Sequence, residues 1–465
     1  MSETQTKAIT SPLTFLVEQS TKNMQAGWNI TKHMLGIDWA KTSQSPRDEV
    51  YSDGKATLWH YRSNQVRFGP PVLLIPSLVS RAFILDLQPG NSLVEHLVGQ
   101  GLDVYMMDWG EPDEADAANT LETYTHHMLP RAVREIDRRH QGSGVTLFGY
   151  CFGGVLTLLY AASHPEDPVA NLVQLATPVD FEQMPKSMRI AGSGGVDPDH
   201  VVDETGNVPA AAVRRSFSFL TPTADISTIA DFFEKAHDDK FLNNYQAMTS
   251  WTRNHVPFPG AAFRQTVTML QENNAIVNNT LVLNGTPVDL ADITVPFLNI
   301  LGEKDHIVPP EGSEPLAAMI GSDDKTDLRL NAGHVGMIIG SSSRKRHMPA
   351  ISEWIVERSY GSGEGPKSAA AAKVAAKRKP RAKKATRPRA TKTAAAAKTG
   401  VAAKTGVAAK NGVAAKNGVA KKATEKAVAK KAAPGKKAVA SKKAASAKKA
   451  TASTNGTAPA NGAAS

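Results

Sequence analysis

Short, continuous apolar runs recur along this 465-residue chain, and segments with helical spacing separate them. The runs lie at 72–75, 104–107, 145–148, 169–175, 295–301 and 326–330. Unbroken apolar runs of this length are typical of strands that are buried on both faces, as in a parallel sheet. Helical patterns lie at 93–97, 121–139, 152–163 and 348–357. This alternation predicts a doubly wound, mostly parallel α/β sheet.

Two stretches depart from this rhythm. Residues 49–67 alternate apolar and polar positions, which is typical of edge strands. Residues 182–289 contain helical patches at 228–235 and 245–252 but no regular strand pattern. We predict that residues 182–289 form a cap inserted over the sheet, and that residues 49–181 and 290–360 form the core.

The N-terminal segment has the spacing of an amphipathic helix between residues 11 and 40. Its apolar residues lie at roughly helical intervals: Leu13, Phe15, Leu16, Met24, Trp28 and Met34. We interpret residues 1–48 as a helical arm. We expect its apolar positions to serve packing rather than function.

Charge divides the chain into two parts. The sequence contains 54 Lys and Arg residues and 44 Asp and Glu residues, a net charge of +10. From residue 361 onward there are 26 of these bases and 2 of these acids, so this segment carries +24 and the remainder carries −14. Every Trp, Tyr, Phe, Met and His lies before residue 361. A segment so poor in apolar side chains cannot build a core, and we expect residues 361–465 to be a disordered basic tail.

The tail repeats the sequence Val-Ala-Ala-Lys-Thr/Asn-Gly, which spaces Lys398, Lys404, Lys410 and Lys416 six residues apart. Its charge resembles that of the Lys/Ala-rich tails of linker-histone-like proteins and of DNA-binding granule proteins. Basic tails bind phosphates by releasing counterions, and this tail has little chemistry with which to read bases. We expect these lysines to bind DNA without sequence preference, and a tail that only improves solubility is the alternative.

The sequence also argues against a membrane-spanning or secreted protein. Its apolar runs are strand-sized, far short of the roughly 20 residues that a spanning helix needs. Its first residues, Met1-Ser-Glu-Thr-Gln-Thr-Lys, are polar and lack a signal-peptide pattern. The single cysteine excludes an internal disulfide, which suits a reducing compartment. We expect a cytoplasmic protein, and we predict no metal site.

The only cysteine lies in a turn between a predicted strand and a predicted helix. The run at 145–148 leads directly into Gly149-Tyr-Cys151-Phe-Gly153-Gly154. A Gly-x-Cys-x-Gly turn in this position is typical of a nucleophile elbow, where a Cβ at either glycine would collide with a neighbouring element. The sequence therefore predicts that Cys151 is a nucleophile. A buried structural cysteine in a glycine-rich turn is the alternative.

An acid and a histidine follow the last two predicted strands. Asp305 comes after the run at 295–301, and His334 comes after the run at 326–330. The order nucleophile, acid, histidine is that of the α/β-hydrolase fold. We predict that His334 activates Cys151 as a base, with Asp305 as the acid of the triad.

Other residues compete for these roles or complete the site. Asp180, after the run at 169–175, is the alternative acid, and His306 is the local competitor for the base. We expect three histidines in helical patterns to lie on the surface: His126, His127 and His164. We expect the oxyanion hole to consist of backbone N–H groups, from Phe152 and from Leu78 or Val79.

Several motifs together resemble those of the polyhydroxyalkanoate synthases. They span residues from about 70 to 357 and read Phe83-Ile-Leu-Asp86-Leu-Gln-Pro-Gly90-Asn-Ser-Leu, Asp108-Trp109-Gly110, Gly149-Tyr-Cys151-Phe-Gly153-Gly154, Trp251-Thr-Arg-Asn254-His-Val-Pro257, Asp305-His306-Ile and Gly333-His334-Val-Gly336. This resemblance implies an α/β-hydrolase fold with an inserted cap. It also implies an acyltransferase that polymerises (R)-3-hydroxyacyl-CoA through a Cys-bound acyl thioester and releases CoA.

The resemblance carries further expectations. The CoA thioester is the substrate, so no cofactor is expected. The short body is similar to the small catalytic subunits of the family, which implies an accessory subunit, at least a homodimer, and association with polyester granules. A long Lys/Ala-rich tail is not usual in these synthases, and it suggests an added function.

Two other functions fit the same residues. A cysteine α/β-hydrolase of the dienelactone type, or an acyl-CoA thioesterase, would release free acid instead of polymer. A non-catalytic granule-associated or nucleoid-associated protein would bind without chemistry. Cysteine favours the polymerase, because an acyl-Cys is itself a thioester and its exchange with a CoA thioester is nearly isoenergetic.

Overall fold

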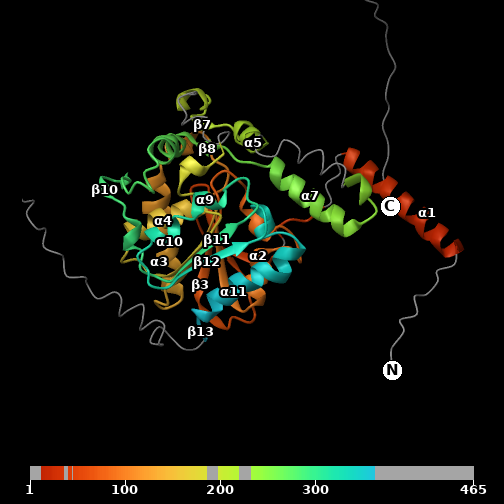
Figure 1. Ribbon diagram of the computed structural model, residues 1–465, viewed down its shortest axis with the longest axis horizontal. Helices are drawn as coiled ribbons and strands as arrows, with labels where there is room; N and C mark the ends of the chain where they lie inside the picture. The colour runs from red at the N-terminus through yellow and green to blue at the C-terminus, as the bar shows by residue number, and fades with distance from the viewer. Residues whose placement is uncertain (1–11, 36–39, 44, 186–196, 219–231, 362–465) are drawn as a thin grey trace, which may run out of the picture. The chain divides into compact units, whose positions relative to one another are not determined.

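The computed structural model describes residues 12–35, 40–43, 45–185, 197–218 and 232–361 of the chain (Figure 1). The predicted basic tail with its four lysines lies outside the described residues from position 362 onward. Part of the helical patch predicted at 228–235 also lies outside them.

One sheet contains all the strands that the apolar runs predict. Its order is β1 (Arg47–Asp53), β2 (Ala56–Tyr61), β4 (Leu102–Asp108), β3 (Phe68–Ile75), β5 (Val145–Tyr150), β6 (Val169–Leu175), β11 (Phe297–Gly302) and β12 (Lys325–Leu330), and β13 (Tyr360–Gly361) pairs with the start of β3. Neighbours from β4 to β12 are parallel, whereas β1, β2 and β13 run antiparallel to their partners. The predicted doubly wound, mostly parallel sheet is therefore confirmed.

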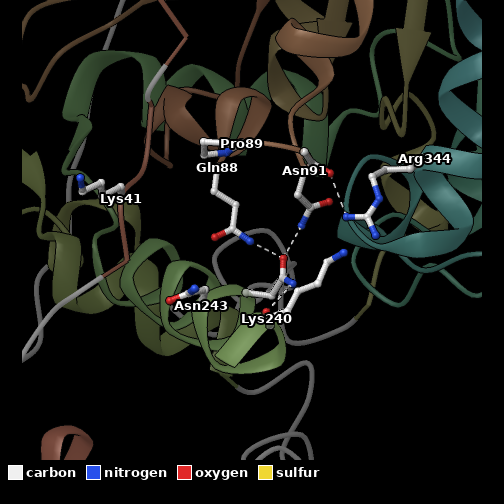
Figure 2. Close-up of a pocket in the computed structure, with 9 residues that line it drawn as sticks. Lys41, Gln88, Pro89, Asn91, Lys240, Asn243 and Arg344 are labelled. Atoms are coloured by element: carbon white, nitrogen blue, oxygen red, sulfur yellow. Dashed lines mark hydrogen bonds between the residues drawn. The ribbon is translucent and has the colours of Figure 1, made fainter. Parts of the chain in front are cut away.

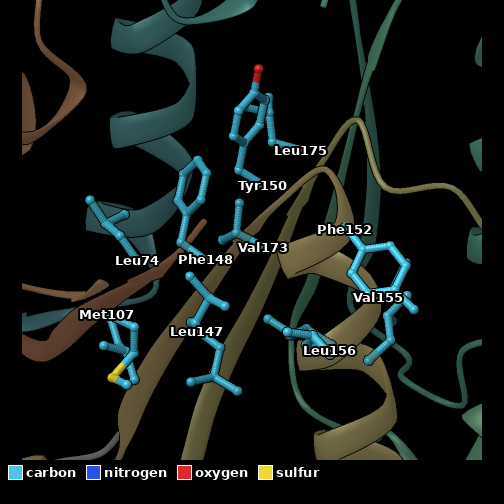
Figure 3. Packing of buried hydrophobic residues seen from close by; sticks show 14 of the residues in the cluster. Leu74, Met107, Leu147, Phe148, Tyr150, Phe152, Val155, Leu156, Val173 and Leu175 are labelled. Atoms are coloured by element: carbon cyan, nitrogen blue, oxygen red, sulfur yellow. The ribbon is translucent and has the colours of Figure 1, made fainter. Parts of the chain in front are cut away.

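Burial accounts for the central strands. Every residue of β5, β6 and β11 is buried, so their apolar side chains pack on both faces of the sheet. Figure 3 shows part of this cluster, in which Phe148 of β5 lies between Leu74 of β3 and Val173 of β6. At the end of the sheet, β12 alternates exposed and half-buried residues, as an edge strand does.

Helices cover both faces of the sheet (Figure 1). On one face α2 (Leu93–Gly99) contacts α11 (Met348–Glu357), and on the other α3 (Leu129–Arg139) contacts α4 (Phe152–Ser163). The helix predicted at 121–139 contains a π-helical segment, η3 (Thr123–Met128), directly before α3. The shorter elements are η1 (Ala82–Asp86), η2 (Glu114–Asp116), η4 (Phe181–Gln183), η8 (Leu290–Asp292), α9 (Pro310–Ser313), α10 (Leu316–Met319), η9 (Val335–Met337) and η10 (Ser343–His347).

The region predicted as a cap lies between η4 and η8. Its described elements are η6 (Pro198–His200), α5 (Ala210–Ser218), α7 (Asp239–Arg253), α8 (Gly260–Gln265) and η7 (Thr266–Glu272), with the short pairs β7 (Asn207–Val208) to β8 (Phe258–Pro259) and β9 (Val282–Leu283) to β10 (Thr286–Pro287). The patch predicted at 245–252 falls within α7. The C-terminal end of α7 contacts the loop after β3, because the Trp251 Nε1–H donates to the Arg81 carbonyl at 3.0 Å.

The N-terminal arm departs from its prediction. Helix α1 (Pro12–Met34) forms where the spacing predicts it, but Met24 and Trp28 are exposed rather than packed. The reason is that α1 contacts α7 through polar side chains on another face, including Asn29. The side chains of the other predicted packing residues, Leu13, Phe15, Leu16 and Met34, lie outside the description. Along the described residues, no helix combines the length and apolar character needed to cross a membrane.

Helix α4 approaches β3 and β5 so closely that two positions admit no side chain. A Cβ at Gly149 would overlap the backbone of Gly154 in the first turn of α4. A Cβ at Gly153 would overlap the carbonyl groups of Ile75 and Pro76, at the end of β3. Because backbone atoms cannot move aside as a flexible side chain can, glycine is required at both positions.

We expect Gly153→Ala to lower the free energy of unfolding by roughly 1–3 kcal/mol, the usual cost of forcing an extra methyl group into a packed interior. Gly99→Ala is the matched control, because a Cβ at Gly99 meets nothing within 4 Å. Urea titration of both variants measures the difference. A Gly153→Ala protein as stable as the control would contradict this account of the α4 packing.

Candidate active site

Cys151 lies at the tip of the turn from β5 to α4. Its backbone has φ 57° and ψ −125°, a conformation that non-glycine residues rarely adopt. Two hydrogen bonds hold it there: its N–H donates to the Leu175 carbonyl and its carbonyl accepts from the Gly154 N–H, both at 2.9 Å. The thiol side chain is half-buried. This is the geometry that the predicted nucleophile elbow requires.

The structure brings Asp305 and His334 together from the loops after β11 and β12. The His334 Nδ1 lies 2.7 Å from Asp305 Oδ2, and both side chains are almost completely buried. The other carboxylate oxygen, Oδ1, accepts from the backbone N–H groups of Ile307 at 2.8 Å and Val308 at 2.9 Å. Both oxygens of Asp305 are thus engaged, and its orientation toward the histidine is fixed.

The protonation of His334 depends on its two neighbours. Burial by itself would lower the pKa of this imidazole, but the charge of Asp305, the charge of Cys151 and hydrogen bonds to both raise the pKa to about 10. Because Nδ1 faces Asp305, Nε2 remains for the sulfur. At neutral pH the arrangement favours a protonated histidine next to the cysteine, which is the partner that a thiolate nucleophile needs.

The ring of Tyr150 packs against the imidazole of His334, a contact that the sequence did not predict. The two ring centroids lie 5.1 Å apart at an interplanar angle of 35°. Tyr150 is only 1% exposed, and its hydroxyl has no hydrogen-bond partner among the described residues. In Figure 3 this hydroxyl points away from the apolar cluster. Burial raises the phenol pKa well above its ordinary value, so the ring stays neutral. The sequence offered one signal for this contact, since Tyr150 directly precedes Cys151 at the end of β5.

The predicted oxyanion groups lie on adjoining segments. Phe152 begins α4, and the absence of a side chain at Gly153 lets this turn approach the carbonyl of Pro76. The Val79 N–H already donates to Ser77 Oγ at 3.4 Å, which leaves the buried Leu78 as the better candidate of the two.

An indole anchors each end of the segment that contains Leu78 and Val79. Trp109 Nε1–H donates to the Pro76 carbonyl at 3.0 Å, and Trp251 bonds to Arg81 as described above. These two bonds fix the loop next to the elbow.

The structure does not bring the competing acid or base to the histidine. Asp180 Oδ1 accepts from the Glu182 N–H at 3.1 Å and from Asn274 Nδ2 at 2.8 Å, so its carboxylate caps η4 instead. His306 is exposed, although it adjoins Asp305 in sequence. The Asp180 carboxylate is therefore bonded elsewhere, and the His306 side chain is at the surface.

The three helical histidines differ from one another. His127 is exposed, as predicted, and its side chain is 64% accessible. His126 and His164 are half-buried, because their rings pack against each other with centroids 4.7 Å apart. The surface prediction is therefore wrong for these two.

A cavity of about 490 Å³ lies apart from these residues (Figure 2). It is lined by Lys41, Gln88, Pro89, Gly90, Asn91, Lys240, Asn243, Asn244 and Arg344. Across it, Asn244 of α7 accepts hydrogen bonds from Gln88 and Asn91, so the cavity marks where the cap helix docks on the loop before α2. None of the triad residues lines it. Within the described ranges, no group of three or more His, Cys, Asp or Glu is arranged to hold a metal ion.

Comparison with known proteins gives a family match and several relatives. Residues 70–341 match the family model described as alpha/beta hydrolase fold. The poly(3-hydroxyalkanoate) polymerase subunit PhaC of Allochromatium vinosum is 35% identical over 70% of this chain and 93% of its own length. Its namesake in Synechocystis is 35% identical over 70% and 88%, and that of Haloferax mediterranei is 32% identical over 77% and 75%. Among solved structures, the monoacylglycerol lipase of Paleococcus ferrophilus is 20% identical with a TM-score of 0.37, covering 64% of this chain and 98% of its own.

Asp305→Asn removes a charge next to His334 but leaves the imidazole buried, so we expect the pKa of His334 to fall from about 10 toward or below 6.5. Because the pKa of His334 is higher in the folded protein than in the unfolded chain, protonated His334 stabilises the fold. This stabilisation is complete below pH 6.5 and is lost as the pH rises through 10. The free energy of unfolding should therefore fall less between these pH values in the variant than in the wild type.

Histidine-selective NMR titration and urea unfolding across that pH window measure both effects. Cys151→Ala is the control, because it removes the second charge and should give a pKa between those of the wild type and Asp305→Asn. An Asp305→Asn protein whose His334 still titrates near pH 10 would show that the carboxylate is not the cause.

Proposed function

This chain belongs to the poly(3-hydroxyalkanoate) polymerase family, and we propose that it makes polyester by carrying the acyl chain on Cys151. Family membership makes it an acyltransferase that synthesises polyhydroxyalkanoate on an α/β-hydrolase scaffold. The observation that supports the catalytic assignment is the 2.7 Å contact of Asp305 with the His334 imidazole, whose pKa Asp305 and the neighbouring Cys151 both raise.

The first step transfers an acyl group from CoA to the enzyme. The Cys151 thiolate attacks the thioester carbonyl of a 3-hydroxyacyl-CoA, and the carbonyl oxygen becomes an oxyanion. The backbone N–H groups of Phe152 and Leu78 are the proposed donors to that oxyanion. The carbon–sulfur bond to CoA then breaks, and the leaving thiolate takes the proton of His334. The products are acyl-Cys151, free CoA and a neutral histidine.

The second step forms the ester bond. The hydroxyl of another 3-hydroxyacyl unit gives its proton to the neutral His334 and attacks the acyl-Cys151 thioester. The ester forms as the bond to sulfur breaks, and the thiolate and protonated histidine return. Asp305 acts through His334 in this scheme, since one of its oxygens faces the imidazole and the other is held by two backbone N–H groups.

Water must be kept from the acyl-enzyme, because hydrolysis would end the polymer. The burial of His334 and Asp305 supports this requirement, and so does the contact of Trp251 in α7 with the loop after β3. We propose that the region 182–289 acts as a cap over the thioester. No cofactor enters the proposed chemistry, since the CoA thioester supplies the energy of each bond.

The setting of the enzyme is also proposed. We infer that it works in the cytoplasm at the surface of polyester granules, together with an accessory subunit. The support is the resemblance of its short body to the small catalytic subunits of the family.

A second binding function is proposed for the basic tail. The aligned region covers 93% of the Allochromatium vinosum relative but only 70% of this chain, so most of what lies beyond that region has no counterpart there. The charge of +24 after residue 360 supports an added partner with many phosphates. We propose that Lys398, Lys404, Lys410 and Lys416 contribute to sequence-independent binding of duplex DNA.

Cys151→Ala should reduce CoA release from 3-hydroxybutyryl-CoA by about 10⁴-fold or more, because it removes the nucleophile. Its fold should be unchanged, since Cys151 is a half-buried turn residue at the edge of the core and alanine leaves only a small gap there. Cys151→Ser should lose roughly 100-fold or more, because an alcohol is a weaker nucleophile and its ester lacks the exchange energy of a thioester. Thiol titration of CoA and sizing of the polymer measure both variants.

The product of the wild type separates the polymerase from its rivals. Free 3-hydroxy acid without polymer, with and without accessory subunits, would favour a thioesterase. Full activity in Cys151→Ala would make the body a binding protein. Robust polymer formation by Cys151→Ser would remove the thioester argument.

The full-length protein should shift duplex DNA of any sequence in a gel, with a steep loss of binding as salt increases. A protein truncated after Tyr360 should not shift DNA but should still make polymer. Phosphate contacts are strong at roughly 50 mM salt. If the full-length protein does not shift DNA under these conditions, the DNA proposal is contradicted.

A further inference from the structure

The cavity in Figure 2 is lined by charges of one sign. Three of its nine lining residues are cations, Lys41, Lys240 and Arg344, and none is an Asp or a Glu. The chain up to residue 360 carries a net charge of −14, so a group of cations without acids is an exception in it. Lys345 and Arg346 follow Arg344 directly and extend the positive potential beyond the cavity. We call the space that Lys41, Lys240 and Arg344 surround the basic cavity.

These three cations make no ion pair with any Asp or Glu that the structure describes. Other exposed cations of the body do pair, as Lys55 does with Asp113. In Figure 2 the side chain of Lys240 extends toward Arg344 rather than away from it. Like charges that approach each other cost free energy, and an anion between them removes this cost. The arrangement therefore favours an anionic ligand over a gap that only water fills.

The acids near the basic cavity are held by other donors. Asp238 caps α7, because its Oδ1 accepts from the Lys240 N–H at 2.9 Å. Both carboxylate oxygens of Asp239 accept hydrogen bonds from amide side chains of α1. Glu95 accepts from the Gly90 N–H at 2.5 Å. These carboxylates leave the positive charge of the basic cavity unpaired.

Hydrogen bonds fix two walls of the basic cavity. Asn244 of α7 accepts from the side chains of Gln88 and Asn91, which joins the helix to the loop before α2. Arg344 Nη1 donates to the Gly90 carbonyl of the same loop at 2.8 Å. A side-chain amide has two N–H donors, so Gln88 and Asn91 each keep one for a ligand. The basic cavity thus offers hydrogen-bond donors as well as charge.

The third wall is the segment that contains Lys41. The Ala40 N–H donates to Gln246 Oε1 of α7 at 2.8 Å, and the Ser43 N–H donates to the Asp86 carbonyl at 2.9 Å. Lys41 therefore lies between two anchored positions. The three cations come from separate segments of the chain that are held around one space, and such preorganisation lowers the cost of binding.

The number and type of these groups favour phosphate. A phosphate monoester carries a charge of about −1.5 to −2 at neutral pH, whereas a carboxylate carries one negative charge. Arginine matches phosphate oxygens with its planar fork, and lysine supplies a point charge. The volume of about 490 Å³ lies in the range of small-molecule sites, roughly 300–1,000 Å³. This space accommodates a phosphate that is attached to a larger body.

We propose that the basic cavity binds a small molecule through its phosphate groups, between α7 and the body. Two sources share this chemistry: the phosphates of CoA, and a separate ligand such as a nucleoside diphosphate. The bound phosphate fastens α7, whose Trp251 holds the loop after β3. The inference concerns binding and does not depend on the catalytic role of Cys151.

Isothermal titration calorimetry of the full-length protein with CoA, ADP and pyrophosphate tests the proposal. We expect the Kd of at least one probe to rise about 3- to 10-fold in Lys41→Gln and in Lys240→Gln, and roughly 10-fold or more in the double variant. Neither lysine side chain makes a hydrogen bond with a described residue, so urea unfolding without ligand should not weaken. The basic tail is the same in every variant, so the differences in Kd report the cavity.

Lys345→Gln is the matched control, because it removes the same charge from an exposed residue that adjoins Arg344 but does not line the cavity. It should change the Kd by less than about 2-fold. A loss in Lys345→Gln as large as in Lys240→Gln would mean diffuse attraction to surface charge and would overturn the proposed site. Unchanged Kd values for all three probes in the double variant would overturn it as well.

The probes also separate the two sources. If CoA loses affinity in the double variant and pyrophosphate displaces CoA from the wild type, the basic cavity holds the phosphates of CoA. If CoA binds both proteins equally while ADP or pyrophosphate loses affinity in the double variant, the ligand is a separate one. A protein that makes polymer but shows neither effect would overturn this proposal and leave the proposed function intact.

Discussion

The candidate active site depends on the close contact between the first turn of α4 and the end of β3. That contact exists because Gly149 and Gly153 carry no side chains where Gly154, Ile75 and Pro76 approach. It places the sulfur of Cys151, the N–H of Phe152 and the loop after β3 next to one another. Two indole hydrogen bonds then hold this loop, one from Trp109 in the body and one from Trp251 in the region predicted as a cap. A packing constraint thus positions the groups that the proposed chemistry uses.

The charges around His334 determine its protonation. Asp305 is held by two backbone N–H groups, so its negative charge stays in one place beside His334. Tyr150 lies against the imidazole from below and remains neutral, so it fills space without adding a competing charge. The histidine is therefore protonated because of its surroundings, in spite of its burial. Each of these residues lies at the carboxyl end of a strand or directly after one, where a parallel sheet gathers its loops.

Much of this was predictable from the sequence, and the reasons are local. The strand at 169–175 and the helix at 152–163 have the predicted bounds, because a fully buried run and a glycine turn determine them without distant help. Asp305 and His334 were found because strand order alone brings the ends of β11 and β12 together. The hydrophobic spacing also predicted α1, but spacing cannot tell whether an apolar row faces the chain's own core or another molecule. The contact of Tyr150 with His334 could be found only from the folded structure, since 184 positions separate the two residues in the sequence.

The backbone of Cys151 has one further consequence. Its positive φ is a conformation that suits glycine, and a residue with a Cβ is held there at a cost of about 1–3 kcal/mol. Native proteins are stable by only about 5–15 kcal/mol, so this single position takes a noticeable share. Drift toward stability therefore favours glycine at the position of the proposed nucleophile. If Cys151 carries the acyl chain as proposed, the sulfur persists only while selection for turnover outweighs that bias.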